Sequence, residues 1–237
     1  MLTNQNVSTQ FTTSQKFGTT IYLTSTGVSQ VDAHMMKNIE WGAVAYLKQS
    51  KYGLGTTDIG LNNYLDETDL NNGGTNYLKT GCGIASGSAL STTCNAYNTT
   101  DGMLASTTGN ITGVYDMSAA MGTSVMGVME TSDGTALTYS SSGFTTSTLP
   151  FNSKYVDQYE FGGSTRDYPR RILGDATGEV NGWYGDIARF VYSDGPWFIR
   201  GSSGYDGPAF AGVFSFYVRG GKPNPELVFR SVLAPGA

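Results

Sequence analysis

Charged residues are scarce in this sequence, and histidine and cysteine are nearly absent. Only 14% of the residues are charged, one is histidine and two are cysteine. An ordinary globular domain carries about 25% charged residues. The polar surface must therefore consist mostly of Ser, Thr, Asn and Gly. This composition is typical of a loop-rich domain that works outside the cell.

These scarcities exclude several kinds of site. The single histidine, His34, cannot build a multi-histidine metal site, and neither cysteine belongs to a CxxC or Cys/His cluster. The net charge of −5 gives no electrostatic reason to bind nucleic acid, and no polybasic patch indicates a membrane surface. No apolar run is long enough to span a bilayer, and the first residues lack a signal-peptide pattern. We expect no direct membrane insertion, and a leader absent from this chain.

The two cysteines, Cys82 and Cys94, lie in a stretch rich in Gly, Ser and Thr. In an oxidising compartment a disulfide would close this loop, which has few other groups to order it. We expect the Cys82–Cys94 disulfide, and two free thiols are the alternative.

The chain of 237 residues is long enough for one large domain, and 3 Trp, 15 Tyr and 11 Phe can fill its core. Ser29 can cap a helix over residues 30–50. That helix is predicted because apolar residues recur every four positions: Val31, Met35, Ile39 and Ala43. His34 lies off this stripe, and no nucleophile motif accompanies it. We interpret it as a surface or hydrogen-bonded helix residue rather than a general base.

The rest of the chain is predicted to form loops and short elements. Turn-forming clusters make residues 54–112 a long irregular region, which the disulfide would pin. A short helix is predicted over residues 152–160. Short strands are predicted at residues 188–191, 197–200, 211–218 and 228–233. Within the third, Phe214 and Phe216 alternate with Ser215 and Tyr217, which predicts one buried and one exposed face. The sequence predicts a single α+β domain over residues 1–237.

Several motifs together resemble one family of domains. Residues 113–118 (GVYDMS) and 229–233 (FRSVL) are similar to the YDM signature and the terminal strand of formylglycine-generating-enzyme-like domains. Residues 40–47, 182–186 and 197–201 resemble bacterial surface and pilin-associated proteins with the same domain. The resemblance runs from about Asn4 to Leu233. It implies a C-type lectin-like fold, loop-rich with few helices and short antiparallel strands. The usual Trp-Glu pair is absent, with Gly122 and Thr123 in its place.

Residues 197–233 resemble the variable region of proteins diversified by retroelements, in which errors at template adenines change Asn codons into many residue types. The resemblance implies a fixed framework: Trp197, Phe198, Arg200, Gly201, Gly207, Ala211, Gly212, Val213, Phe214, Phe216, Gly220 and Arg230. It implies that other positions vary and bind ligand: Ser202, Ser203, Tyr205, Asp206, Pro208, Phe210, Ser215, Tyr217, Val218, Pro223, Pro225, Leu227 and Val228. Lys222 and Glu226 complete this predicted surface, although they need other template codons.

Among these residues, the aromatic side chains divide into two groups. Phe214, Phe216 and Phe229 are expected in the core. Tyr205, Phe210 and Tyr217 are expected to be exposed, because tyrosine gives large contact area at low entropic cost.

The sequence therefore predicts a binding protein rather than an enzyme: an extracellular or cell-surface adhesin that recognises a surface protein or glycan. Display on a pilus, a cell surface or a phage tail would fit the resemblance. No cysteine follows Cys94, so the thiol chemistry of formylglycine-generating enzymes cannot be carried over. The alternatives are a divergent enzyme of that type, a carboxylate-based hydrolase, and a structural pilin or tail subunit.

Calcium is the one cofactor that the sequence raises, through two acidic clusters. Neither cluster has EF-hand spacing, and acidic loops are usually solvated, so no cofactor is predicted. The clusters are Asp175, Glu179 and Asp186, and Asp66, Glu67 and Asp69.

Overall fold

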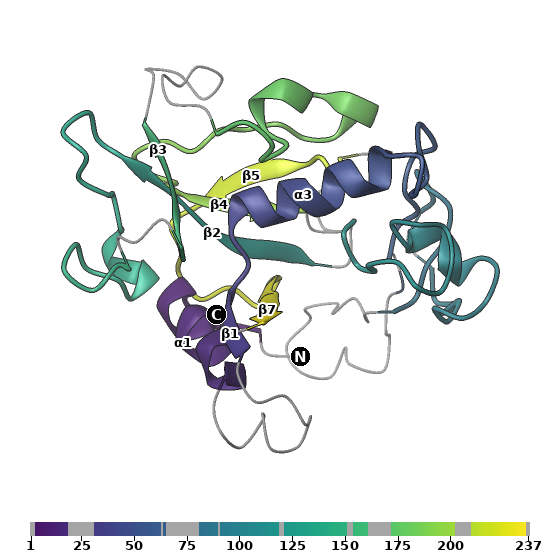
Figure 1. Cartoon of the computed structure of the whole chain (residues 1–237), viewed down its shortest axis with the longest axis horizontal. Helices are drawn as coiled ribbons and strands as arrows, with labels where there is room; N and C mark the ends of the chain where they lie inside the picture. Colours follow the sequence, from purple (N-terminus) through teal and green to yellow (C-terminus); the bar gives the residue numbers. More distant parts are fainter. Residues whose placement is uncertain are drawn as a thin grey trace.

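A computed structural model gives the arrangement of the chain (Figure 1). It describes residues 3–18, 31–62, 64, 81–89, 91–118, 121–150, 154–160, 172–201 and 210–235. The α-helices and strands in this part of the chain are α1 (Val7–Gln15), β1 (Val31–Met35), α3 (Asn38–Gln49), β2 (Gly122–Glu130), β3 (Asp157–Glu160), β4 (Trp197–Arg200), β5 (Phe216–Arg219), β6 (Leu227–Phe229) and β7 (Ser231–Pro235). Short 3-10 helices are η1 (Lys16–Gly18), η3 (Gly102–Ala105), η4 (Ser140–Ser142), η5 (Gly178–Val180) and η6 (Trp183–Gly185). The prediction of a mixed α+β fold with few helices is confirmed.

The central sheet has the strand order β3-β2-β4-β5, and β6 also pairs with β2. Strand β2 runs parallel to β3 and β6 and antiparallel to β4. All nine residues of β2 are buried, as expected for a strand covered on both faces. Gly122, where the resemblance expects a bulkier residue, starts β2. A Cβ there would lie 2.8 Å from the side chain of Leu227, so the small residue allows β6 to pack closely.

Helix α3 crosses one face of this sheet (Figure 1). Its buried residues are Asn38, Trp41, Gly42, Ala45 and Lys48. The indole Nε1 of Trp41 donates to the carbonyl of Val213 at 2.7 Å. This contact ties the helix to the segment that leads into β5.

The predicted helix over residues 30–50 is wrong in its first part. Residues Val31–Met35 form β1, which pairs antiparallel with β7 near the other end of the chain. The side chain of Glu40 then accepts the backbone N–H of Lys37 at 2.7 Å and so caps the start of α3. The apolar residues that recur every four positions belong partly to the strand and partly to the helix, because β1 and α3 follow one another closely in the chain. Ala43, predicted on the buried stripe, is exposed.

A second, smaller core joins the two ends of the described chain. Helix α1 packs beside β1 and β7. Its residues Val7 and Phe11 share a buried cluster with Met35, Phe144 and Trp197. Asn6 caps α1 by accepting the N–H of Thr9 at 2.9 Å.

Other predicted elements are confirmed or corrected by the pairing of strands. The strand over residues 197–200 is confirmed as β4. The helix predicted over residues 152–160 is wrong where it is described, because Asp157–Glu160 form β3 beside β2. The strand predicted over 211–218 begins at Phe216, and that over 228–233 is divided into β6 and β7. Between 188 and 191 only Ala188 forms a bridge, to Phe216.

The part of residues 54–112 that is described is irregular, as predicted, with isolated bridges and η3. Within the described ranges, every helix is too short or too polar to cross a membrane.

Candidate ligand-binding site

A hollow of about 260 Å³ lies beside β5, at the edge of the central sheet. Three segments that are distant in the sequence meet there. Tyrosine rings and basic side chains dominate its lining, which consists of Tyr139, Tyr192, Asp194, Gly195, Tyr217, Val218, Arg219, Gly220 and Lys222.

Strand β5 supplies the floor of this hollow. It pairs antiparallel with β4, with Ile199 opposite Tyr217. Val218 is buried, whereas Tyr217 and Arg219 are half-buried, because successive side chains of a strand point to opposite faces. The tyrosine ring and the guanidinium are thereby placed on the same face of β5.

A tight turn forms one wall. Tyr192 and Gly195 exchange backbone hydrogen bonds of 3.2 and 3.0 Å around Ser193 and Asp194. A Cβ at Gly195 would lie 3.0 Å from the side chain of Val218, so glycine lets the turn rest on β5. This packing fixes Asp194 at the tip of the turn, next to the floor.

Tyr139 forms another wall. Its φ of 58° lies in the left-handed region, which is uncommon for a bulky residue and is often found at functional sites. The Nε1 of Trp197 donates to the carbonyl of Thr138 at 2.9 Å and holds this backbone in place. A Cβ at Gly220 would lie 3.0 Å from the Tyr139 ring, so the ring packs directly on the end of β5. Tyr139 is still 46% exposed.

The ring of Tyr217 is held by two arginines. The guanidinium carbons of Arg189 and Arg219 lie 5.1 and 4.8 Å from its centroid. Arg189 Nη1 also donates to the hydroxyl oxygen of Tyr217 at 3.0 Å. Cation–π contacts of this kind are worth about 0.5–1 kcal/mol each at exposed sites. The ring is therefore ordered before any ligand arrives.

The charge of the hollow is opposite to that of the chain. Arg219 and Lys222 line it and Arg189 lies over the ring of Tyr217, with Asp194 as the single carboxylate among the described lining residues. Across the described residues, no carboxylate lies within 4.0 Å of any of these three cations. The hollow thus presents unpaired positive charge in a chain of net charge −5.

The structure brings only part of the predicted binding surface to this hollow: Tyr217, Val218 and Lys222. Phe210 is 49% exposed, as predicted, and its carbonyl accepts the N–H of Ile187 at 3.1 Å. Pro223 is exposed, whereas Pro225, Glu226 and Val228 are half-buried. Five predicted positions lie outside the described residues: Ser202, Ser203, Tyr205, Asp206 and Pro208.

Three predicted surface positions are buried. Ser215 is wholly buried, because its N–H bonds back to the carbonyl of Gly212 at 3.1 Å in a turn before β5 begins. The alternation expected between Phe214 and Ser215 therefore does not apply. The side chain of Val218 is buried on the inner face of β5, and that of Leu227 is buried beside Gly122. Ser215 and Leu227 do not line the hollow, and Val218 contributes little exposed surface to it.

The core predictions hold for Phe214 and Phe216, which are buried, whereas Phe229 is only half-buried. Sequence reasoning missed Tyr139, Tyr192, Asp194 and Arg219 as site residues. The strand pattern places Arg219 beside Tyr217, but no local signal brings residues 139 and 192–195 to β5.

Asp186, which directly follows η6, anchors the segment that leads into β5. Its buried carboxylate accepts the N–H of Phe214 at 2.9 Å, and burial raises its pKa to about 7. Asp175 accepts instead from Tyr159 at 2.6 Å, and Glu179 accepts from Tyr46 at 2.9 Å. The three carboxylates of this acidic cluster, which could in principle have bound calcium, thus have separate protein partners.

Within the described residues, no group of three or more His, Cys, Asp or Glu side chains could hold a metal ion. Asp66, Glu67 and Asp69 lie outside the described part.

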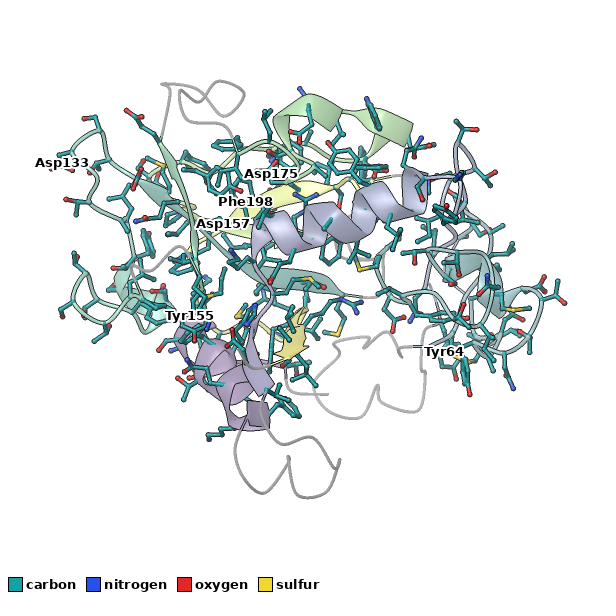
Figure 2. The ribbon with its side chains drawn as sticks, in the orientation of Figure 1. Tyr64, Asp133, Tyr155, Asp157, Asp175 and Phe198 are labelled. Carbon is teal, nitrogen blue, oxygen red and sulfur yellow. A yellow bond between two sulfur atoms is a disulfide. The ribbon has the colours of Figure 1, made fainter. Side chains whose placement is uncertain are left out.

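A buried polar network lies between α3 and the sheet, where Figure 2 labels Asp157, Asp175 and Phe198. Arg200 is fully buried. Its Nη1 donates to Asn38 Oδ1 at 3.1 Å, and its Nη2 donates to the carbonyl of Ala176 at 2.8 Å. Burial lowers the pKa of Arg200 to about 10 and raises the pKa of Asp175. The network joins α3, β4 and the segment at residues 175–176 in the interior, which is a structural role.

His34 lies in β1 and not in a helix, and it is buried. Its Nε2 is 2.9 Å from Glu40 Oε1, and its Nδ1 is 3.7 Å from Asp32 Oδ1. The hydrogen bond to Glu40 raises the pKa of His34, against the effect of burial. A hydrogen-bonded histidine was expected, and the geometry agrees.

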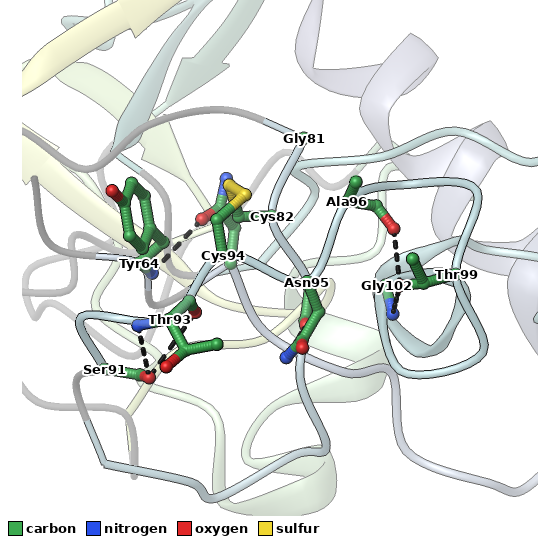
Figure 3. The surroundings of a disulfide bond; sticks show 12 residues. Tyr64, Gly81, Cys82, Ser91, Thr93, Cys94, Asn95, Ala96, Thr99 and Gly102 are labelled. Carbon is green, nitrogen blue, oxygen red and sulfur yellow. Dashed lines mark hydrogen bonds between the residues drawn. A yellow bond between two sulfur atoms is a disulfide. The ribbon is translucent and has the colours of Figure 1, made fainter.

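The predicted disulfide between Cys82 and Cys94 is confirmed (Figure 3). Beside it, Gly83 donates its N–H to the carbonyl of Asn95 at 2.9 Å, and Asn95 Nδ2 donates back to the carbonyl of Gly83 at 3.0 Å. The bond closes a loop within the irregular region and lies outside the lining of the hollow.

Comparison with models of known protein families gives no match, and comparisons with curated proteins and with solved structures give none either.

Proposed function

We propose that this chain is a displayed ligand-binding protein that recognises a surface protein or a glycan through the hollow beside β5. Its fold would be the C-type lectin-like fold of the formylglycine-generating-enzyme type, which the sequence motifs resemble. One observation carries the proposal: Tyr217 and Lys222, predicted as ligand contacts from the resemblance, line the same hollow as Tyr139 and Tyr192.

The hollow has the properties of a recognition site. Tyr139, Tyr192 and Tyr217 offer large, amphipathic surfaces with few rotatable bonds, which lowers the entropic cost of binding. Contacts with glycines and with arginines hold the rings in place. Such preorganisation favours affinity because little ordering is left to occur when the ligand binds.

The arrangement favours binding over the enzymatic alternative. General acid–base catalysis needs titratable groups within reach of a substrate. The strongly shifted pKa values of Tyr159 and Arg200 belong to fully buried side chains that serve the interior network. Asp194 is the one carboxylate among the described lining residues, so a carboxylate pair for hydrolysis is not assembled there.

Retroelement diversification would act on the accessible part of residues 197–233, which includes the exposed Phe210 and the half-buried Tyr217. The disulfide is compatible with an extracellular or cell-surface location, as on a pilus, a cell or a phage tail. A near-identical copy of the coding segment for residues 197–233 beside a reverse transcriptase gene, differing at template adenines, is the expected genomic observation. Its absence would remove diversification from the proposal and leave the binding site.

The binding role is tested with the labelled chain on printed arrays of glycans and of surface-protein ectodomains. We expect the native chain to bind members of one array, and the double variant Tyr139→Ser/Tyr217→Ser, which changes two lining tyrosines, to lose at least about tenfold in affinity. Tyr52→Ser is the matched control, because Tyr52 is 73% exposed and does not line the hollow. If the native chain binds to neither array, or if a folded double variant binds with undiminished affinity, the proposal is overturned.

A further inference from the structure

We infer that the hollow beside β5 selects an acidic sugar, a pyranose ring that carries a carboxylate. This inference rests on the proposed binding function and names the class of ligand. Three features carry it: unpaired cations, tyrosine faces and the small size of the hollow.

The cations supply the selectivity for negative charge. Lys222 is exposed, Arg219 is half-buried on the floor, and Arg189 lies over the Tyr217 ring. In the described chain none of the three has a carboxylate partner within 4.0 Å. A planar guanidinium can donate two parallel hydrogen bonds to a carboxylate, and lysine adds a point charge. An acidic group would therefore gain contacts here without first displacing a protein carboxylate.

The tyrosines and Asp194 suit a sugar ring. Aromatic faces pack against the C–H faces of a pyranose, while phenolic hydroxyls donate to and accept from its hydroxyl groups. The carboxylate of Asp194, fixed at the tip of its turn, can accept hydrogen bonds from two sugar hydroxyls. A ligand that combines hydroxyls with one negative charge uses both kinds of group in the lining.

The size and the overall charge argue against larger polyanions. Pockets for drug-sized ligands usually measure about 300–1,000 Å³. At about 260 Å³ the hollow accommodates a ligand the size of a single ring. The net charge of −5 repels an extended nucleic acid, whose binding depends on many cationic contacts.

The experiment compares two probes that differ at one carbon. The ¹⁵N-labelled full chain is titrated with sodium glucuronate and with glucose, and amide shifts are followed at Gly195 and Gly220, which line the hollow. We expect glucuronate to bind at least about tenfold more tightly and to weaken as salt is added. Glucose should shift the same amides at higher concentration.

Charge variants distinguish selective binding of the carboxylate from nonspecific binding. Arg219→Gln/Lys222→Gln should reduce glucuronate affinity to the level of glucose while leaving the amide spectrum of a folded chain. Lys51→Gln is the control, since Lys51 also lies over a tyrosine ring, 4.9 Å from the centroid of Tyr52, outside the hollow. It should leave glucuronate affinity unchanged.

Each remaining outcome overturns the inference. Equal binding of glucose and glucuronate, or an unchanged affinity in the double charge variant, removes the acidic selectivity. Binding of neither sugar, or tighter binding of a single-stranded oligonucleotide, removes the ligand class. The proposed binding function survives these results if the native chain still binds an array through Tyr139 and Tyr217, so the two failures are distinguishable.

Discussion

The carboxylate of Asp186 occupies the space into which a side chain at Gly212 would extend. A Cβ at Gly212 would lie 2.0 Å from both carboxylate oxygens, and one of these oxygens accepts the N–H of Phe214 at 2.9 Å. The pair fixes the segment that enters β5 and thereby the floor of the hollow. The two residues come from different parts of the chain, so neither alone reveals the relationship.

Gly212→Ala should lower the free energy of unfolding by about 3 kcal/mol, because the new methyl group forces the buried carboxylate or the backbone to move. Urea unfolding followed by tryptophan fluorescence measures the loss. Gly87→Ala is the control: φ there is +74° with open space around it, so strain alone should cost about 1 kcal/mol. In an Asp186→Ala background the Gly212→Ala loss should shrink, and equal losses at positions 87 and 212 would contradict the close contact.

The stability of the protein should depend on pH through Asp186, whose pKa rises from 3.8 to about 7 on burial. Between these values the folded state binds more protons than the unfolded state, so stability falls as pH rises through this window. Asp186→Asn removes this titration and keeps an acceptor for Phe214. Relative to the variant, the native chain should lose up to about 4 kcal/mol between about pH 4 and pH 8. Parallel pH profiles of the two proteins in urea would refute the assignment.

His34 is a base rather than an acid, but stability should depend on its titration in the same direction as on that of Asp186. Its folded pKa is raised above 6.5, chiefly by the hydrogen bond to Glu40. The stability it contributes is present below pH 6.5 and is lost as pH rises through the folded pKa. Because the chain has one histidine, its imidazole ¹H resonance reports the titration directly.

The matched variant for His34 is Glu40→Gln, which keeps an oxygen to cap α3 but removes the charge beside the imidazole. The midpoint of the histidine titration should move down in this variant. A native midpoint below that of a free histidine would show that burial outweighs the contact with Glu40.

Removing the disulfide should lower stability without affecting the hollow. Cys82 and Cys94 are 12 positions apart, and a loop of that length constrains the unfolded chain by about 3 kcal/mol. Cys82→Ser/Cys94→Ser should lose about 2–3 kcal/mol in urea unfolding. A thiol reductant should produce the same loss in the native chain and none in the variant. A change in glucuronate affinity would show that the loop reaches the site.

Local sequence patterns were sufficient where one segment carries the whole signal. The apolar run at Trp197–Arg200 predicted β4 with its observed bounds, and the isolated pair of cysteines predicted the disulfide. They failed where a distant partner decides the structure. Val31–Met35 is a strand because β7 lies beside it, and Ser215 is buried because Gly212 turns the chain before β5.

By itself the sequence determined an α+β, loop-rich chain with a cross-linked loop, and its resemblance predicted Tyr217 and Lys222 as ligand contacts. These properties follow from composition, spacing and motifs, which are written along the chain. Only the tertiary structure placed Tyr139 and the 192–195 turn against β5 and gathered unpaired cations in an acidic protein. Such juxtapositions depend on close contacts at Gly195 and Gly220, between residues far apart in sequence. No local pattern encodes those contacts, because packing of the whole core decides them.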